Sequence, residues 1–226
     1  MPPDTATPVE SALSAQPAIP RFDRVERTLH WVNATLFGVL MLTGAALYAG
    51  PVSTIVGNRV LVRSLHVYSG LALPLPLLVA ISGRRGTRLR DDLGRLNRWT
   101  RDDARWFRRR HRRTVALGKF NPGQKLNAAF IGGAAIVMLA TGSIMRWFEP
   151  FPIDYRTGAT FVHDWFALGI WVSVLGHIFF ALRDSDALDA MVSSGTVPAA
   201  WARRNAPLWY QELGAASPPV TSTDAP

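Results

Sequence analysis

Four long apolar segments constrain the fold of this 226-residue chain more than any other feature of its sequence. At a rise of about 1.5 Å per residue, a helix of about 20 residues crosses the hydrocarbon core of a bilayer, which is about 30 Å thick. The sequence therefore predicts an all-α fold, an integral membrane four-helix bundle. Its helices are expected over residues 31–50, 65–82, 126–147 and 160–182, each nearly free of charged side chains.

The charge distribution predicts how this bundle is oriented. The chain has a net charge of +9, and residues 84–125 alone carry fifteen Lys and Arg against four Asp, a net charge of +11. Basic flanks of membrane helices stay on the cytoplasmic side. We therefore expect both termini, and the basic segment between helices 2 and 3, to lie on the cytoplasmic side of the inner (cytoplasmic) membrane. Leucine and aromatic residues among the arginines of 89–113 favour contact with lipid headgroups, and no nucleic-acid partner is expected.

The sequence predicts one membrane domain between two tails. Residues 1–20 are rich in Pro, Ala and Ser and are predicted to be a disordered N-terminal tail. Residues 214–226 are predicted to be a disordered C-terminal tail. Residues 21–213 form the predicted membrane domain, and the aromatic and arginine content of 199–213 indicates a docked end. The chain has no cysteine, which excludes disulfides, thiolate zinc sites, iron–sulfur clusters and covalently attached haem.

Four of the five histidines fall in or at the start of the predicted helices, and the exception is His111 in the arginine-rich segment. Ionisable side chains at membrane depth are costly and usually functional. The alternating helix directions bring His30 and His177 to the cytoplasmic side, and His66 and His163 to the outer side. The fourteen residues between His163 and His177 correspond to about 21 Å of rise and a difference in facing of only about 40°.

Two histidine pairs stacked along a helical bundle suit two planar cofactors, each held by facing helices. Imidazoles on both sides of an iron leave no open position, which favours electron transfer, and haem b fits because the chain has no CxxCH motif. The sequence thus predicts two b haems, one ligated by His30 with His177 and the other by His66 with His163. Zinc fits poorly because the two pairs lie at opposite faces. A non-redox membrane anchor or transporter is the alternative from another class.

Several segments together resemble the cytochrome b (gamma) subunit of formate dehydrogenases, and they are also similar to the cytochrome b subunits of nickel–iron hydrogenases. These segments are RFDRVERTLHW (21–31), LHVYSG (65–70), GKFNPGQK (118–125) and AAWARR…PLWYQEL (199–213), together with the spacing of His163 and His177. The resemblance covers residues 21–213 and implies a dihaem membrane anchor. It further implies that iron–sulfur or molybdopterin partner subunits deliver electrons, which the two haems carry to the quinone pool.

The resemblance also implies a binding site for menaquinone, or another quinone, beside the cytoplasmic haem, where the quinone is reduced. This site would lie near His177 and include Asn121, Gly123 and Gln124 of the GKFNPGQK segment. Without the resemblance, the Asn-Pro-Gly sequence indicates only a turn at the membrane surface. A hydrogenase or another respiratory complex remains an alternative source of electrons.

Overall fold

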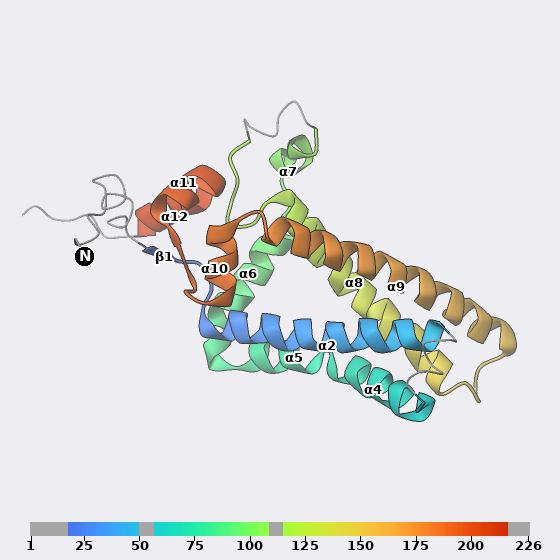
Figure 1. Cartoon of the computed structure of the whole chain (residues 1–226). Coiled ribbons are helices and arrows are strands. Elements are labelled where there is room, and N and C mark those ends of the chain that lie inside the picture. Colours follow the sequence, from blue (N-terminus) through green and yellow to red (C-terminus); the bar gives the residue numbers. More distant parts are fainter. Residues whose placement is uncertain (1–17, 50–56, 109–114, 217–226) are drawn as a thin grey trace, which may run out of the picture.

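The computed structural model describes residues 18–49, 57–108 and 115–216, and helices dominate this part of the chain (Figure 1). His111 and most of both predicted tails lie outside the described residues. Four spans are long and apolar enough to cross a bilayer. The prediction of a helical membrane protein with four spans is therefore confirmed. The spans are α2 (Arg24–Tyr48), α4 with α5 (Arg59–Ala72 and Leu75–Ser82), α8 (Pro122–Arg146) and α9 (Ile153–Ala181).

The spans are longer than the apolar runs because polar residues start them. In α2, Asp23 Oδ1 accepts a hydrogen bond from the backbone N–H of Glu26 at 2.8 Å, and the carboxylate of Glu26 accepts one from the backbone N–H of Asp23 at 2.7 Å. This reciprocal capping box satisfies backbone donors that a helix start leaves free. Hydropathy detects the apolar middle of such a helix, and so the prediction placed its start at residue 31 instead of Arg24.

The second span is two helices instead of the single helix predicted over 65–82. Helix α4 ends at Ala72, and α5 begins at Leu75. Pro74 lies between them and Pro76 lies in the first turn of α5, where the missing N–H of proline disturbs no hydrogen bond. The proline pair thus interrupts the helix inside the membrane.

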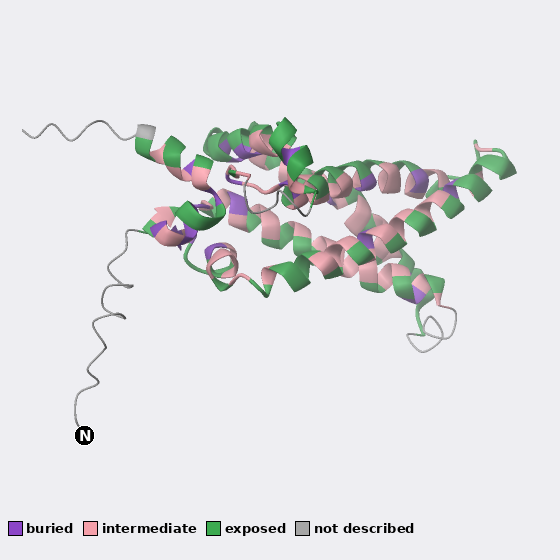
Figure 2. Ribbon diagram, turned by 90° about the horizontal axis from the view of Figure 1, so that it is seen from above, coloured by how far each residue is buried: buried purple, intermediate pink, exposed green. Residues whose placement is uncertain are grey.

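The four spans form two antiparallel hairpins, α2 with α4–α5 and α8 with α9 (Figure 1). Helices pack most extensively within each hairpin, and α4 also contacts α8. Most side chains of the spans are exposed or half-buried (Figure 2). This pattern suits helices whose outer faces meet lipid, because lipid solvates apolar side chains that water would drive inward.

One end of the bundle carries a compact layer of short elements, which we call the basic end (Figure 1). The C-terminal region supplies its apolar core, in which two indole rings pack with small residues. These core residues are Ala190, Val197, Trp201, Ala202, Ala206 and Trp209. The basic end comprises β1 (Ala18–Pro20), the 3-10 turn η1 (Arg84–Gly86), α6 (Thr87–Asn97), α7 (Arg101–Trp106), α10 (Ser185–Val192), β2 (Thr196–Pro198), α11 (Ala199–Asn205) and α12 (Pro207–Ala216).

Two parts of the predicted tails are ordered. Residues 18–20 form β1, which pairs antiparallel with β2 so that Ile19 lies opposite Val197. Gly195 makes this possible with a φ of 74°, and its carbonyl accepts hydrogen bonds from the backbone N–H groups of Arg21 and Phe22 at 2.8 and 3.0 Å. Helix α12 likewise continues three residues past the predicted domain end at 213. The first and last described elements, β1 and α12, therefore lie at the basic end, whose cytoplasmic location stays a prediction from charge.

Candidate functional site

The structure brings the four helix histidines together in the two pairs that their spacing predicted. His30 of α2 and His177 of α9 have ring centroids 6.0 Å apart, with planes inclined at 56°. His66 of α4 and His163 of α9 have ring centroids 6.2 Å apart, with planes inclined at 64°. The first pair lies toward the basic end and the second toward the opposite end. Each pair joins one hairpin to the other.

The spacing of the rings fits a metal ion bound between two imidazoles. An imidazole nitrogen lies about 2 Å from an ion that it ligates and about 1 Å from its own ring centre, so rings on opposite sides of one ion have centroids about 6 Å apart. Both pairs match this value. Within the described residues no three His, Cys, Asp or Glu side chains gather as a metal cluster. The donor set therefore suits a group that needs two axial ligands, such as haem b, and does not suit a structural zinc ion.

A threonine from the neighbouring helix of the same hairpin contacts each histidine of the pair far from the basic end. Thr43 Oγ1 lies 3.0 Å from His66 Nδ1, and Thr141 Oγ1 lies 2.9 Å from His163 Nδ1. The residue after each threonine is a glycine, and its missing side chain admits the ring. A Cβ on Gly44 would lie 3.2 Å from His66 Cε1. The equivalent contact of a Cβ on Gly142, with His163 Cε1, would be 3.4 Å.

The residues of the predicted quinone site form the beginning of α8. Asn121 is its N-cap, and Asn121 Oδ1 accepts from the N–H of Gln124 while Gln124 Oε1 accepts from the N–H of Asn121, both at 2.9 Å. This capping box uses both amide oxygens. The structure records no hydrogen bond from either amide NH2 group to the described residues. Gly123 lies against Trp106, since a Cβ there would come within 3.4 Å of the indole.

Asn121 and Gln124 line a cavity of about 520 Å³ at the basic end. Lys119 and Trp201 contribute other parts of its wall, and Gly123, His30 and His177 are not among its lining residues. The cavity is large enough for a small organic molecule. Two amide side chains thus line a volume that could hold a ligand headgroup.

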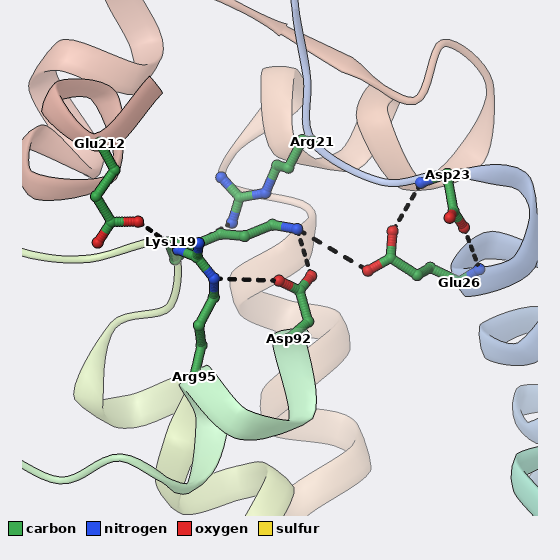
Figure 3. Close-up of polar contacts among 7 residues, drawn as sticks. All are labelled: Arg21, Asp23, Glu26, Asp92, Arg95, Lys119 and Glu212. Atoms are coloured by element: carbon green, nitrogen blue, oxygen red, sulfur yellow. Dashed lines mark hydrogen bonds and ion pairs between the residues drawn. The ribbon is translucent and has the colours of Figure 1, made fainter. Parts of the chain in front are cut away.

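A buried group of charged residues adjoins this cavity (Figure 3). The ammonium group of Lys119 forms an ion pair with Asp92 of α6 and lies 3.9 Å from Glu26 Oε1 of α2. Arg95 connects the group to α12, because its Nη1 lies 2.7 Å from Glu212 Oε2. These contacts join α2, α6, α12 and the segment before α8 at one point.

Arg21 lies next to this group and is almost fully buried. Its guanidinium lies over the ring of Trp201, 4.2 Å from the ring centroid, and one nitrogen donates to the carbonyl of Lys119 at 3.4 Å. Burial lowers the pKa of Arg21 to about 10, although Asp184 and Asp92 act in the opposite direction. Two guanidinium nitrogens have no hydrogen-bond partner in the described structure. These two nitrogens have almost no accessible surface, although Arg21 is among the residues that line the cavity.

Sequence reasoning missed the threonines, although a signal was present. The sequences MLTG (41–44) and MLATG (138–142) recur in the first helix of each hairpin, and each precedes its histidine by similar distances. The threonine-to-histidine separations are 23 and 22 residues. The missed signal is therefore a weak internal repeat instead of a motif within one segment.

Comparison with known proteins finds a matching family and several similar proteins. A family model described as prokaryotic cytochrome b561 matches residues 21–194. The chain is 27% identical over 209 residues to the formate dehydrogenase cytochrome b556(fdo) subunit of Escherichia coli K12, covering 86% of this chain and 93% of that protein. It is 25% identical over 194 residues to the formate dehydrogenase cytochrome b556 subunit of Haemophilus influenzae, covering 82% and 79%. A nitrate-inducible cytochrome b556(Fdn) subunit of Escherichia coli K12 is 22% identical over 209 residues.

Proposed function

Because the chain belongs to the prokaryotic cytochrome b561 family, we propose that it is the membrane cytochrome b subunit of a formate dehydrogenase-like complex. In this role it carries electrons between an extracytoplasmic oxidoreductase and the quinone pool. The observation that supports this function best is that four histidines form two pairs. In each pair the ring centroids lie about 6 Å apart, and the two rings come from different hairpins. Two b haems, when bound there, supply reversible one-electron transfer.

The residues of the chain have separate tasks in this proposal. His66 and His163 hold the haem at the outer side, which is the side nearer to the electron-donating partner. His30 and His177 hold the haem nearer to the basic end. His177 is exposed, while the other three histidines are half-buried. In this proposal, electrons leave the chain from this inner pair toward an acceptor in the membrane.

The acceptor in this proposal is menaquinone or a related quinone. Asn121 and Gln124 line the cavity at the start of α8, and their amide NH2 groups are suited to donate to a quinone carbonyl. Gly123 lets Trp106 close against the start of α8. Lys119 and its carboxylate partners lie beside the same cavity, where they could pass protons from the aqueous side to a reduced quinone.

Other subunits complete the reaction. The relatives are named as cytochrome subunits of formate dehydrogenase, and the chain itself has no cysteine for an iron–sulfur cluster. We therefore propose iron–sulfur and molybdopterin subunits as partners. In this proposal the chain itself spans the cytoplasmic membrane, and its basic end lies in the cytoplasm.

Haem content tests the proposed function directly. We expect the purified chain to contain two b haems by pyridine haemochrome and a reduced-minus-oxidised spectrum. His66→Ala or His163→Ala should each remove one haem, and His30→Ala or His177→Ala the other. A folded wild-type chain without haem, expressed with adequate haem supply, would favour a non-redox anchor or transporter. Retention of both haems in His66→Ala would contradict the pairing.

The quinone site has its own test. Asn121→Asp and Gln124→Glu keep the capping oxygens but remove the NH2 donors. Loss of a hydrogen bond worth about 0.5–1.5 kcal/mol should slow reoxidation of the reduced haems by a menaquinone analogue about two- to tenfold. Asn58→Asp is the matched control, because Asn58 caps α4 through its side-chain oxygen at the opposite end of the bundle. Equal rates in Asn121→Asp and Asn58→Asp would contradict the quinone site.

A further inference from the structure

We propose that Thr43 and Thr141 are positioning residues that fix the ring tautomers of His66 and His163 and lower the reduction potential of the metal centre between them. This inference rests on the proposed function, because it concerns the haem held by that pair. It concerns two residues that no motif of the sequence singled out.

The hydrogen atoms of the two threonines decide the tautomer. Thr43 Oγ1 lies 2.6 Å from the carbonyl oxygen of Val39, one helical turn back, and Thr141 Oγ1 lies 2.8 Å from that of Val137. A carbonyl only accepts, so each hydroxyl commits its single hydrogen to this bond. The hydroxyl oxygen can then only accept from the ring nitrogen beside it. His66 Nδ1 and His163 Nδ1 must therefore carry hydrogen, which leaves both Nε2 lone pairs free to ligate a metal.

The arrangement occurs twice, once in each hairpin. Thr43 and Gly44 of α2 face His66 of α4, and the Thr–Gly pair of α8 faces His163 of α9 in the same way. A chance contact would have no reason to recur with the same atoms. The glycine brings the two helices close enough for the hydroxyl to reach the ring, so the Thr–Gly pair acts as one unit.

The other histidine pair lacks this arrangement. No hydroxyl of the described residues forms a hydrogen bond with a ring nitrogen of His30 or His177. The ring of His30 instead meets the indole of Trp31 edge to face, with centroids 5.4 Å apart. The two metal centres therefore differ in the surroundings of their ligands, although both have two histidines.

This difference has a consequence for electron transfer. A ligating imidazole that donates its second N–H to an acceptor becomes a more basic ligand. A more basic ligand stabilises the oxidised metal, so it lowers the reduction potential. Two such bonds at the outer centre, with no counterpart from the described residues at the inner one, lower the outer potential relative to the inner. Electrons from an outer partner are thereby directed toward the inner centre.

The test is redox titration of the full-length membrane protein with Thr43→Val and Thr141→Val, which keep the shape of the side chain and remove the hydroxyl. We expect each variant to shift one of the two haem midpoints to a more positive value, and the double variant to shift the same midpoint further. Thr43→Ser, which keeps the hydroxyl, should restore the wild-type midpoint. A His30→Ala background, expected to retain only the outer haem, identifies which midpoint moves.

Thr35→Val is the matched control. Thr35 lies in the same helix as Thr43 and its hydroxyl donates to the carbonyl of Trp31 at 2.9 Å in the same way, but it forms no hydrogen bond with a described histidine. Unmoved midpoints in both Thr43→Val and Thr141→Val, or an equal shift in Thr35→Val, would overturn the inference while leaving the dihaem function standing. If Thr43→Val loses one haem, retention of that haem in Thr43→Ser supports the inference. Loss of the same haem in Thr43→Ser contradicts the inference. A wild-type chain without haem would overturn the proposed function and this inference together.

Discussion

Replacing Lys119 by Met should strongly destabilise the basic end. The side chains of Lys119, Asp92 and Glu26 are only 7%, 8% and 6% exposed. Methionine has a similar volume, so packing is largely retained, but both buried carboxylates lose the ammonium group of Lys119, and Asp92 keeps only Arg95, whose Nε lies 3.8 Å from Asp92 Oδ1. Breaking a buried ion pair by removing one partner costs about 3–5 kcal/mol. In a protein of this size, 1 kcal/mol corresponds to about 2–4 °C in the unfolding midpoint, so we expect a decrease of about 6–20 °C.

The assay is thermal unfolding in detergent, followed by tryptophan fluorescence because Trp201 and Trp209 lie in the adjacent core. Arg105→Met is the matched control, since Arg105 Nη1 lies 3.0 Å from Asp102 Oδ1 but the two side chains are 62% and 52% exposed. Exposed pairs contribute about 0–1 kcal/mol, so this variant should lose at most about 4 °C.

A second variant separates charge from packing. Adding Asp92→Asn to Lys119→Met removes one of the two carboxylates that have lost Lys119, and the midpoint should recover in part. The reasoning would be refuted if Lys119→Met lowered the midpoint no more than Arg105→Met does. It would also be refuted if the added Asp92→Asn lowered the midpoint further.

Two other predictions concern the same end of the molecule. Gly195→Ala should destabilise the junction of β1 and α2 by at least about 1–2 kcal/mol, because its φ is positive and the new Cβ would lie 2.7 Å from the carbonyl oxygen of Phe22. Amide hydrogen exchange in β1 should therefore be faster in Gly195→Ala than in the wild type. Gly214→Ala is the contrasting variant, because a Cβ there meets no atom within 4 Å, and it should stabilise α12 by about 0.5–1 kcal/mol. Burial raises the pKa of Asp103, but hydrogen bonds from Lys125 and from the Thr100 cap outweigh burial and hold the pKa below its ordinary value of 3.8. The attachment of α7 to α8 should therefore be complete above that pH and be lost as the pH falls through the lower folded-state value, and Asp103→Asn should remove this dependence. Trp106 fluorescence between pH 6 and pH 2 measures it, and an identical profile in both proteins would contradict it.

The spans and the histidine pairing could be predicted because both follow from properties of each helix taken separately. Length and hydropathy locate a span, charge orients it, and a rise of about 1.5 Å per residue gives the depth of each histidine. His30 with His177 and His66 with His163 follow from depth and helix direction alone. Their roles as haem ligands stay a prediction.

Features that depend on contacts between segments were missed. The strand at 18–20 forms only because β2, almost 180 residues later, offers a partner, and three residues of sequence carry no such signal. Thr43 reaches His66 because two helices pack in one register, which hydropathy does not specify. The function expected of Asn121 and Gln124 came from resemblance, whereas their capping geometry could be predicted from the Asn-Pro-Gly-Gln spacing.

The division into two self-packed hairpins also bears on how the molecule is made. Each hairpin can enter the bilayer by itself, since its helices satisfy their own backbone hydrogen bonds and pack with each other. A histidine pair, by contrast, exists only after the two hairpins have met, because each pair takes one residue from either side. Each hairpin can therefore insert before the histidines pair. A prosthetic group held by both pairs would join the two halves of the molecule.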